Sequence, residues 1–408
     1  MHLLQKFPEL LLQLPNLNGI TIVAPTNEAF ERIPLTSLNA IWKADDASVA
    51  VPILQYHIVM GQFPADAMTP GAPVFAPTLL TDPRWTNLSA GGQLVRADKQ
   101  PDGFVALTSG FGSRSSLVPF SKDGRRDLRF AGGIVQAVDN LLVPPTALNE
   151  TLTAYSDLSF LGALYAAGLY DEFATCGASG NCTIFAPSVR AFRAVNSTLA
   201  SLSRDDLIKV LRYHMVPGQV LTSNLLSNGT TLPSALASGS AQKQLQVRRA
   251  GNYLYLNSAH VVQQDLLFAN GVAHLLDNVL NPFPDPAGDA QQPTPNPELG
   301  TQVPVFSTGS AEAGYATVTD ADAMNSLPLP FTTALPCTVS CPEPTVTDPA
   351  AAAGGSGRGA SSTHSARATT SSSKGLAAAA RCTGLARPAS AAVAAALAWG
   401  VGGYWAGV

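Results

Sequence analysis

The sequence is poor in charged residues and has no excess of positive charge. Charged residues make up 13% of the 408 residues, and 24 Lys and Arg face 28 Asp and Glu, which gives a net charge of −4. Domains that bind nucleic acid through its phosphates usually carry a strong basic excess, so nucleic acid is not an expected partner. The hydrophobic fraction of 46% argues against a wholly disordered chain and against a polytopic membrane protein.

The common catalytic motifs are also missing in any credible setting. We find no phosphate-binding loop, no G-x-G-x-x-G, no G-x-S-x-G, no H-E-x-x-H and no C-x-x-C. An enzyme is therefore the weaker class of function. No cofactor, catalytic residue or metal ligand is predicted.

Cysteine is scarce, and the spacing of the cysteines indicates an oxidising compartment. Five cysteines occur, and two close pairs, Cys176 with Cys182 and Cys337 with Cys341, suit local disulfides in an oxidising compartment. A zinc site needs about four Cys or His ligands, and no histidine lies within about ten residues of these four cysteines. Free thiols are the alternative, and Cys382 has no evident partner.

The main positive feature of the sequence is an internal repeat. The sequence ITIVAPTNEAF at 20–30 recurs as CTIFAPSVRAF at 182–192, and LQYHIVMGQF at 54–63 recurs as LRYHMVPGQV at 211–220. A third block, GGIVQAVDNLLVPP at 132–145, recurs as NGVAHLLDNVLNPF at 270–283. Three matched blocks in one order indicate a tandem duplication, whose copies we call repeat 1 and repeat 2.

The repeat unit is predicted to be α+β. Short β-rich runs at 21–24 and 183–186 end at proline, and Thr26 and Ser188 then suit N-caps of helices. A second helix leads into a strand at each Tyr-His, and alternating runs such as QLVRAD, FVALTS, LQVRR and YLYLN predict hairpin strands. The expected fold is an antiparallel sheet with helices grouped in the N-terminal half of each repeat.

The first helices of the two repeats differ in extent. The pattern predicts a helix at about Leu152–Phe173 of repeat 2, and helical spacing of leucines over the first residues of repeat 1. Aligned on the repeats, Met1 lies opposite Ala163, part-way along that helix. The N-terminal stretch is a poor signal peptide, because Lys6 and Glu9 interrupt it. We expect that a preceding segment, with the signal peptide, is missing.

At TIVAPTNEAF, YHIVMGQ and GGIVQAVDNLLVPP the chain resembles the fasciclin domain, a cell-adhesion module found in tandem in extracellular proteins. The resemblance implies two fasciclin-like domains, at 1–147 and 148–284, each a wedge of two packed sheets plus helices. A Pro/Ser/Thr/Ala-rich stalk at 285–388 and a hydrophobic tail at 389–408 are then expected, as in surface-anchored fungal members. One departure is Ser188-Val189-Arg190, where the family more often has Thr-Asn/Asp-x.

In animal members of the family the Tyr-His block is implicated in partner contacts. The resemblance places that binding role on Tyr56, His57, Tyr213 and His214 here. From the residues alone, a core histidine bonded to backbone is favoured, because no partner carboxylate recurs in both repeats. A hydrolase that uses His57 or His214 is a remote third hypothesis.

Three other groups of residues have a functional and a plainer interpretation. The recurring pairs Asp139-Asn140 and Asp277-Asn278 suggest metal ligands, but turns are favoured. The basic residues near 120–130 and 243–249 suit acidic glycans or a solvated hairpin: Lys122, Arg125, Arg126 and Arg129 in repeat 1, and Lys243, Arg248 and Arg249 in repeat 2. N-glycosylation is predicted at Asn87, Asn149, Asn196 and Asn228, whereas the sequon at Asn181 lies at a strand entrance that can block it.

The end of the chain has the parts of a lipid-anchor signal. Small residues at Ser371, Ser372, Ser373 and Gly375 precede a spacer and the uncharged stretch Ala389–Val408. That order is typical of a glycosylphosphatidylinositol signal, with a transmembrane helix as the alternative. The sequence thus predicts a non-enzymatic adhesion or matrix protein of the secretory pathway, at the cell surface, wall or plasma membrane. A glycan- or lipid-binding module, extracellular or vacuolar, is the alternative, and the expected partners are cell-surface or matrix proteins, acidic glycans or wall polysaccharides.

Overall fold

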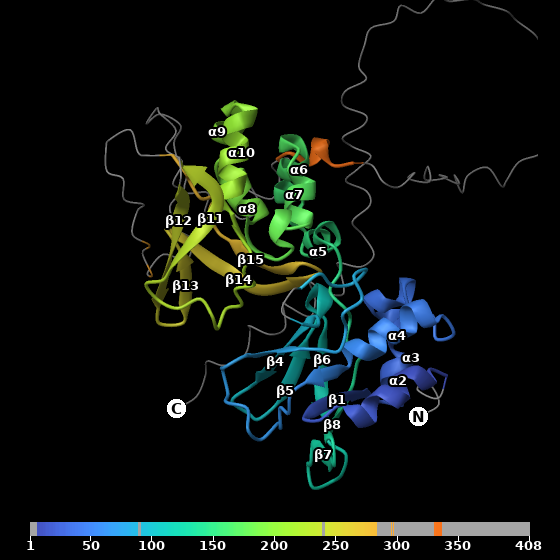
Figure 1. Ribbon diagram of the computed structural model, residues 1–408. Helices are drawn as coiled ribbons and strands as arrows, with labels where there is room; N and C mark the ends of the chain where they lie inside the picture. The colour runs from blue at the N-terminus through green and yellow to red at the C-terminus, as the bar shows by residue number, and fades with distance from the viewer. Residues whose placement is uncertain are drawn as a thin grey trace, which may run out of the picture. The chain divides into compact units, whose positions relative to one another are not determined.

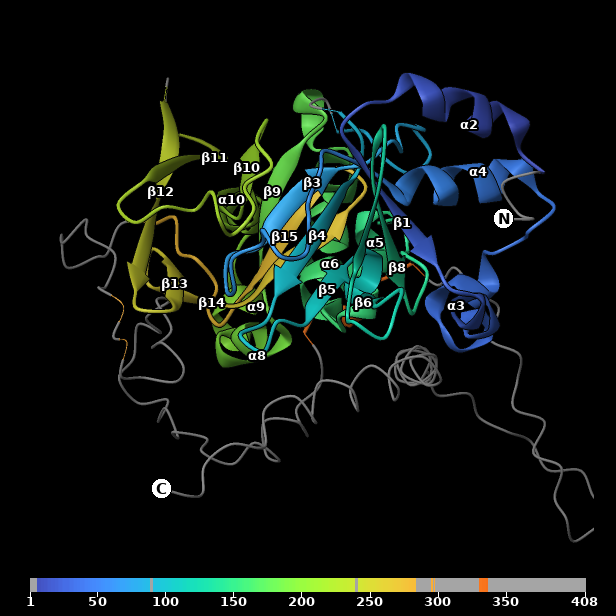
Figure 2. The same cartoon turned by 90° about the horizontal axis from the view of Figure 1, so that it is seen from below.

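The computed structural model describes residues 6–88, 91–238, 241–283, 295, 297 and 330–336, and the predicted stalk and tail lie outside these residues apart from short pieces of the stalk. By its contacts the chain divides into a compact unit, Met1–Leu335, and a second unit, Pro336–Val408. The compact unit holds both repeats, and each forms one sheet with helices beside it (Figures 1 and 2). The α+β prediction for the repeat unit is confirmed.

Repeat 1 has most of its helices in its N-terminal half. Two short helical pieces precede the first strand, and further helical elements lead to the Tyr-His block. Its helices are α2 (Pro8–Gln13), η1 (Leu14–Asn16), α3 (Asn27–Glu31), η2 (Ile33–Leu35), η3 (Ser37–Ala40), α4 (Ala47–Tyr56) and η4 (Gly110–Gly112). Its strands are β1 (Ile20–Pro25), β2 (Ile58–Met60), β3 (Val74–Pro77), β4 (Leu94–Lys99), β5 (Val105–Thr108), β6 (Arg114–Val118), β7 (Asp127–Phe130) and β8 (Gly133–Val138).

Repeat 2 follows the same plan with more helix in front. Its helices are α5 (Leu148–Ala154), α6 (Leu158–Ala167), α7 (Tyr170–Ala174), η5 (Gly177–Ser179), α8 (Val189–Ala194), α9 (Asn196–Ser201) and α10 (Arg204–Tyr213). Its strands are β9 (Cys182–Pro187), β10 (Met215–Pro217), β11 (Thr231–Ser238), β12 (Ala241–Ala250), β13 (Tyr253–Leu256), β14 (Ala259–Phe268) and β15 (Gly271–Leu276). A short helix, η6 (Thr332–Ala334), follows later in the chain.

The strand order is the same in both repeats. It runs β2-β1-β8-β6-β5-β4-β3 in repeat 1 and β10-β9-β15-β14-β13-β12-β11 in repeat 2. Every pairing is antiparallel, as expected, except β1 with β8 and β9 with β15, which are parallel. The first strand of each repeat is therefore hydrogen-bonded to the last one, which closes the unit.

A glycine makes this parallel pairing possible. Gly133 and Gly271 begin the closing strands, opposite Ile20 and Cys182. A Cβ atom on either glycine would lie 1.9 Å from the carbonyl oxygen of the residue opposite. Since real side chains never approach a backbone oxygen so closely, any other residue would push the two strands apart.

The long helix expected at Leu152–Phe173 is in fact three helices, α5, α6 and α7. Ser156, between α5 and α6, has a left-handed φ of 60°. Gly168 ends α6 in the left-handed conformation, with φ 72°, and its N–H bonds back to the helix. The apolar period runs across the break at Ser156 and concealed it, whereas Gly168 is a helix stop that the sequence shows.

The predicted helix starts are confirmed at both Ala-Pro turns. Thr26 and Ser188 have extended backbones, and their hydroxyl oxygens accept hydrogen bonds from the amides of Ala29 and Ala191. The departure at Val189-Arg190 therefore leaves the cap intact. Helices α4 and α10 each lead directly through Tyr-His into a short strand, as the pattern indicated.

One local difference separates the two sheets. In repeat 2 the ten-residue strand β14 pairs along β15. In repeat 1 two shorter strands, β6 and β7, pair with successive parts of β8. The chain leaves the sheet after β6 and returns to it as β7. The intervening residues 119–126 form a hairpin-like excursion, and the loop at β7 projects from the sheet in Figure 1.

Candidate functional site

The imidazole of His57 joins two distant segments of repeat 1. Its Nδ1–H donates to the carbonyl oxygen of Ile53 at 2.7 Å, and its Nε2 accepts from the amide of Leu142 at 2.9 Å. Ile53 lies one turn earlier in α4, whereas Leu142 follows the closing strand β8. The side chain thus fastens the end of the repeat to the helix that precedes β2.

His214 repeats this arrangement atom for atom. Its Nδ1–H donates to the carbonyl oxygen of Val210 at 2.7 Å, and its Nε2 accepts from the amide of Leu280 at 2.9 Å. We call each set a histidine clamp: His57 with Ile53 and Leu142, and His214 with Val210 and Leu280. Because a carbonyl only accepts and an amide only donates, both clamps require the neutral imidazole.

Burial of both rings also sets their pKa. Burial lowers the pKa of His57 and of His214 to about 4, and the bonds to the Ile53 and Val210 carbonyls oppose this only in part. Each ring remains neutral at physiological pH. With both nitrogens bonded to backbone, neither histidine has a free position for a proton from a substrate or for a metal ion.

The preceding tyrosines tie the same helices to the outer strands. Tyr56 donates its hydroxyl to the carbonyl oxygen of Leu94 at 2.7 Å, and Tyr213 to that of Gln244 at 3.0 Å. Asn257 also donates to the Tyr213 hydroxyl. Burial raises the pKa of both tyrosines above the ordinary value.

These positions correct the binding role expected for the Tyr-His blocks. The exposed fraction is 0% for Tyr56, 3% for His57, 4% for Tyr213 and 0% for His214. A partner touches only exposed atoms, so none of the four is available for direct contact. The core interpretation that the residues themselves favoured is the one the structure gives.

A buried threonine completes the site and was missed in the sequence. The Thr21 hydroxyl donates to the carbonyl oxygen of Gly61 at 2.8 Å and accepts from the amide of Phe63 at 3.1 Å. Thr183 does the same with Gln219 and Leu221, both at 2.8 Å. The signal was available, because the same threonine opens the Ala-Pro block in both repeats.

An aspartate in each repeat holds the loop that follows Tyr-His. Asp127 accepts from the amide of Ala65 at 2.9 Å and from the Gln136 side chain at 2.7 Å. Asp265 likewise accepts from the amide and the hydroxyl of Ser223, at 2.7 and 2.6 Å. Neither aspartate was singled out, although each lies five residues before the third matched block, at 132 and 270, so the repeat alignment already pairs them.

Asp265 also forms an ion pair with an arginine of repeat 1. Arg96 of β4 lies with Nη1 3.4 Å from Asp265 Oδ2, and with Nη2 2.9 Å from its own neighbour Asp98. The Asp265 side chain is fully buried. Nearby, the Gln93 side-chain amide donates to the carbonyl oxygen of Phe268 at 3.3 Å. The two repeats are thus joined by ionic and hydrogen-bonded contacts.

The aspartate of each Asp-Asn pair bonds the backbone of a neighbouring strand. Asp139 accepts from the amide of Ser116 at 2.6 Å, and Asp277 accepts from the amide of His260 at 2.7 Å. Each carboxylate secures the end of the closing strand to the preceding strand. Within the described residues no group of three or more His, Cys, Asp or Glu is placed to hold a metal ion.

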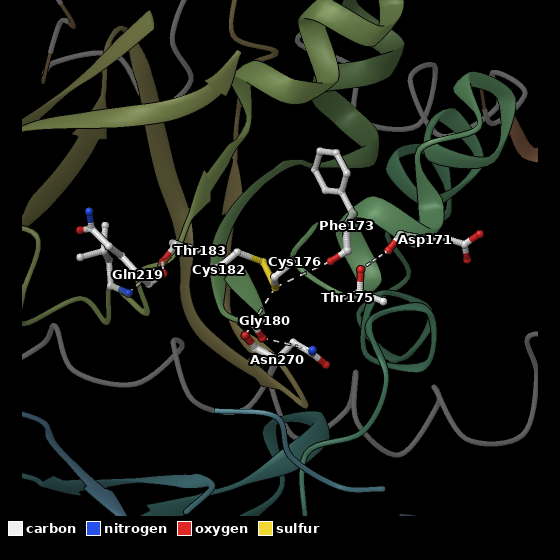
Figure 3. The surroundings of a disulfide bond; sticks show 10 residues. Asp171, Phe173, Thr175, Cys176, Gly180, Cys182, Thr183, Gln219 and Asn270 are labelled. Atoms are coloured by element: carbon white, nitrogen blue, oxygen red, sulfur yellow. Dashed lines mark hydrogen bonds between the residues drawn. A yellow bond between two sulfur atoms is a disulfide. The ribbon is translucent and has the colours of Figure 1, made fainter. Parts of the chain in front are cut away.

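Cys176 and Cys182 form the disulfide predicted from their spacing (Figure 3). The bond links the end of the α5–α7 segment to the first residue of β9, and both cysteines are fully buried. Cys176 has a left-handed φ of 57°, which turns the chain back toward the strand. The second predicted disulfide, between Cys337 and Cys341, lies outside the described residues and stays a prediction. Cys382 lies outside them as well.

The remaining predicted positions vary in exposure. The sequon residues Asn87, Asn196 and Asn228 are exposed, Asn149 is half-buried, and Asn181 is buried. Of the basic residues, Lys122, Arg125 and Arg129 are exposed in the β7 hairpin, whereas Arg249 donates to backbone carbonyls of Ser223 and Leu226. The anchor positions Ser371, Ser372, Ser373 and Gly375 lie outside the described residues.

The family model of the Fasciclin domain matches residues 1–144 and 158–282 of this chain. The chain belongs to the fasciclin family. Its two matched segments correspond to the two repeats, so the histidine clamps, the threonines and the parallel closing strands are features of paired fasciclin domains in this protein.

Fungal fasciclin proteins are among its relatives. The chain is 29% identical over 294 residues to a "Fasciclin-like arabinogalactan protein" of Arthroderma benhamiae, covering 72% of this chain and 65% of the relative. It is 28% identical to "Fasciclin-like arabinogalactan protein elcF" of Phaeosphaeria nodorum, covering 69% and 83%. The pig "Transforming growth factor-beta-induced protein ig-h3" is 26% identical, covering 64% and 33%. The chain therefore spans only part of these relatives, about two thirds of the first.

Proposed function

We propose that this protein is a non-enzymatic adhesion or matrix protein of the cell surface that acts through its paired fasciclin domains. Membership of the family supports an adhesion-type role, and the pig relative ig-h3 aligns with 64% of this chain. The disulfide between Cys176 and Cys182 supports folding in the secretory pathway.

One observation carries the non-enzymatic part of this proposal. The residues most able to do chemistry, His57 and His214, have both ring nitrogens bonded to backbone. A general base needs a free lone pair, and the Nε2 lone pair of each ring already accepts a backbone amide. The chemistry that recurs in the two repeats holds the fold together, and binding falls to the outer surface.

The proposed partners are cell-surface or matrix proteins, with acidic glycans and wall polysaccharides as the alternative. The test is adherence of beads coated with the full chain to cells and to wall polymers, with a broad substrate panel assayed in parallel. We expect increased adherence and no turnover. Adherence equal to that of heat-denatured protein would contradict the proposal, as would turnover that is lost in His57→Gln.

A matched variant tests whether the buried Tyr-His block contacts the partner. Tyr213→Phe removes one hydroxyl from a side chain that is 4% exposed. Adherence should stay unchanged, because no partner can reach that atom. A specific loss of adherence with an unchanged melting temperature would return a binding role to this residue.

We also propose that the hydrophobic C-terminal stretch is a cleaved lipid-anchor signal, with attachment within Ser371–Gly375. Within the described part of the chain, no helix has the length and apolar character to cross a bilayer. Phosphatidylinositol-specific phospholipase C should release the protein from intact cells. Peptides from 389–408 in the mature protein would refute the cleaved anchor.

A further inference from the structure

A short segment of the expected stalk packs against repeat 2. Residues 330–335, which contain η6, belong to the same compact unit as the two repeats, and that unit ends at Leu335. We call residues 330–335 the strap. Figure 1 shows its orange ribbon beside α6, and the two elements are in contact. Residues 284–329 separate the strap from repeat 2 in sequence, so the contact joins distant parts of the chain.

The strap contacts repeat 2 through its apolar side chains. Phe331 and Leu335 pack against the larger hydrophobic core of repeat 2. The ring of Phe331 meets the ring of Phe192, in α8, edge to face, with 6.0 Å between the ring centroids. Pro330 is buried, Phe331 and Leu335 are half-buried, and Thr333 is exposed. The strap therefore turns its apolar residues toward repeat 2 and Thr333 toward solvent.

Gly162 of α6 leaves room for the backbone of the strap. A Cβ atom at this position would lie 2.3 Å from the carbonyl oxygen of Phe331, and its three nearest atoms all belong to Phe331. Seven of the ten residues of α6 are buried, so this helix needs cover on more than one side. Glycine inside a helix is less favourable than alanine. The close approach of the strap accounts for a glycine here.

The shape of the strap depends on its contact with repeat 2. Phe331 has a φ of 61°, in the left-handed region that phenylalanine rarely adopts. Within the strap, the amide of Ala334 donates to the carbonyl oxygen of Phe331 at 3.0 Å, and that of Leu335 to Thr332 at 3.3 Å. So short a helical turn is not stable by itself in water. The surface of repeat 2 therefore holds the strap in this conformation.

We propose that the surface around Gly162 and Phe192 is a peptide-binding site, which the chain closes with its own strap and which opens when the strap leaves. The occupant is the sequence Pro-Phe-Thr-Thr-Ala-Leu of residues 330–335. Burial of Phe331 and Leu335 supplies the attraction. This site is separate from the adhesive role proposed above and does not depend on it. Because the strap is part of the expected stalk, its binding fixes where the stalk leaves repeat 2.

Binding of a free strap peptide tests the site. The probe is a fluorescently labelled peptide of residues 328–336, and the receptor is the full chain with Phe331→Ser/Leu335→Ser, which should vacate the site. We expect saturable binding to this variant by fluorescence anisotropy. Binding to the wild type should be at least about tenfold weaker, because its own tethered strap competes. A peptide with Thr333→Ala is the matched control and should bind equally well, since Thr333 is exposed.

Gly162→Ala closes the site from the side of repeat 2. Added to the vacated variant, it should abolish binding of the peptide, because the new methyl group meets the backbone of Phe331. In the otherwise wild-type chain it should release the strap. Chymotrypsin should then cleave after Phe331 at least about ten times faster than in the wild type, while the circular dichroism spectrum stays that of the folded protein. Thr333→Ala is again the control and should leave the cleavage rate unchanged.

Four outcomes would overturn the proposal. Equal binding by the wild type and the vacated variant would place the peptide elsewhere, and so would binding that survives Gly162→Ala. Absence of saturable binding to the vacated variant up to about 1 mM would remove the peptide site. Equal cleavage after Phe331 in the wild type and in Gly162→Ala would show that the strap is not held at Gly162.

Discussion

His57 accepts a hydrogen bond from the amide of Leu142, 85 residues further along the chain, and this bond is matched by the one from Leu280 to His214. Each pair brings the end of a repeat to the helix that precedes its second strand. Removing the ring leaves a buried amide and a buried carbonyl without partners. We therefore expect His57→Ala and His214→Ala each to lower the free energy of unfolding by about 2–4 kcal/mol.

Urea denaturation followed by far-ultraviolet circular dichroism measures this loss. His260→Ala is the control, because the ring of His260 is half-buried and its backbone amide, not its ring, bonds Asp277. A loss for His57→Ala no greater than that for His260→Ala would show that the clamp is dispensable.

The clamps predict a loss of stability in mild acid. The folded pKa of His57 and His214 is about 4, against 6.5 for an ordinary histidine. Between these values the unfolded chain binds more protons, so stability is fully present above pH 6.5 and falls as the pH approaches 4. Each histidine accounts for about 3 kcal/mol across that window.

Thermal unfolding at pH 7, 5.5 and 4 checks this dependence. His57→Gln keeps a donor and an acceptor but does not titrate, so its stability should fall less steeply with acid than that of the wild type. Identical slopes would mean that other groups cause the acid dependence.

Asp157 predicts that stability depends on pH with the opposite sign. Burial raises the pKa of this carboxyl to about 8, and neither of its oxygens has a hydrogen-bond partner in the described structure. The folded chain then holds a proton that the unfolded chain releases near pH 4, so stability falls as the pH rises from about 4 to 8.

Asp157→Asn should consequently be more stable than the wild type at pH 8, with a gap that narrows toward pH 5. Melting temperatures across this range measure the gap. Glu31→Gln, at an exposed position of α3, is the control and should show no such trend. A constant offset at every pH would indicate a change in packing alone.

The parallel closing strands predict that glycine is required at both their starts. Gly133→Ala or Gly271→Ala should cost at least about 3 kcal/mol, because the new methyl group meets a backbone oxygen. Gly124→Ala is the control: it has open space and a φ of +82°, so it should cost only about 1–2 kcal/mol of backbone strain. Similar losses at Gly133 and Gly124 would rule out crowding as the cause.

Removal of the Cys176–Cys182 disulfide should destabilise the protein modestly. The bond spans six positions in sequence, and closing so short a loop contributes about 2 kcal/mol through the unfolded state. The double variant Cys176→Ser/Cys182→Ser should show that loss in urea. Reduced wild type should approach the variant, and a wild type unaffected by reductant and equal to the variant would leave the disulfide without a stabilising role.

Much of each repeat was predictable from local patterns. The strands ending at Pro25 and Pro187, the caps Thr26 and Ser188, and the Cys176–Cys182 bond follow from turn chemistry and short spacing. The break of the predicted 152–173 helix at Ser156 was concealed, because its apolar period continues through α5 and α6. Gly168 was a visible stop signal of the left-handed kind that ends helices.

The long-range pairings could not be predicted from the sequence. Alternation shows that 133–138 is a strand but not that it runs parallel to β1, since direction depends on contacts far apart in the chain. The bond from Leu142 to His57 and the ion pair of Arg96 with Asp265 join residues 85 and 169 positions apart. The recurrence of Tyr-His showed that the residues matter, whereas only their burial shows that they hold the fold.

The parallel pairing of β1 with β8, and of β9 with β15, has a mechanical consequence. When a protein is pulled between its two ends, load enters a repeat near the start of its first strand and leaves near the end of its closing strand. Because these strands are neighbours and point the same way, their hydrogen bonds bear the force together along the strand direction. These hydrogen bonds must therefore break together by shear and not one after another. Such a geometry resists force on a chain that is held at one end and pulled at the other.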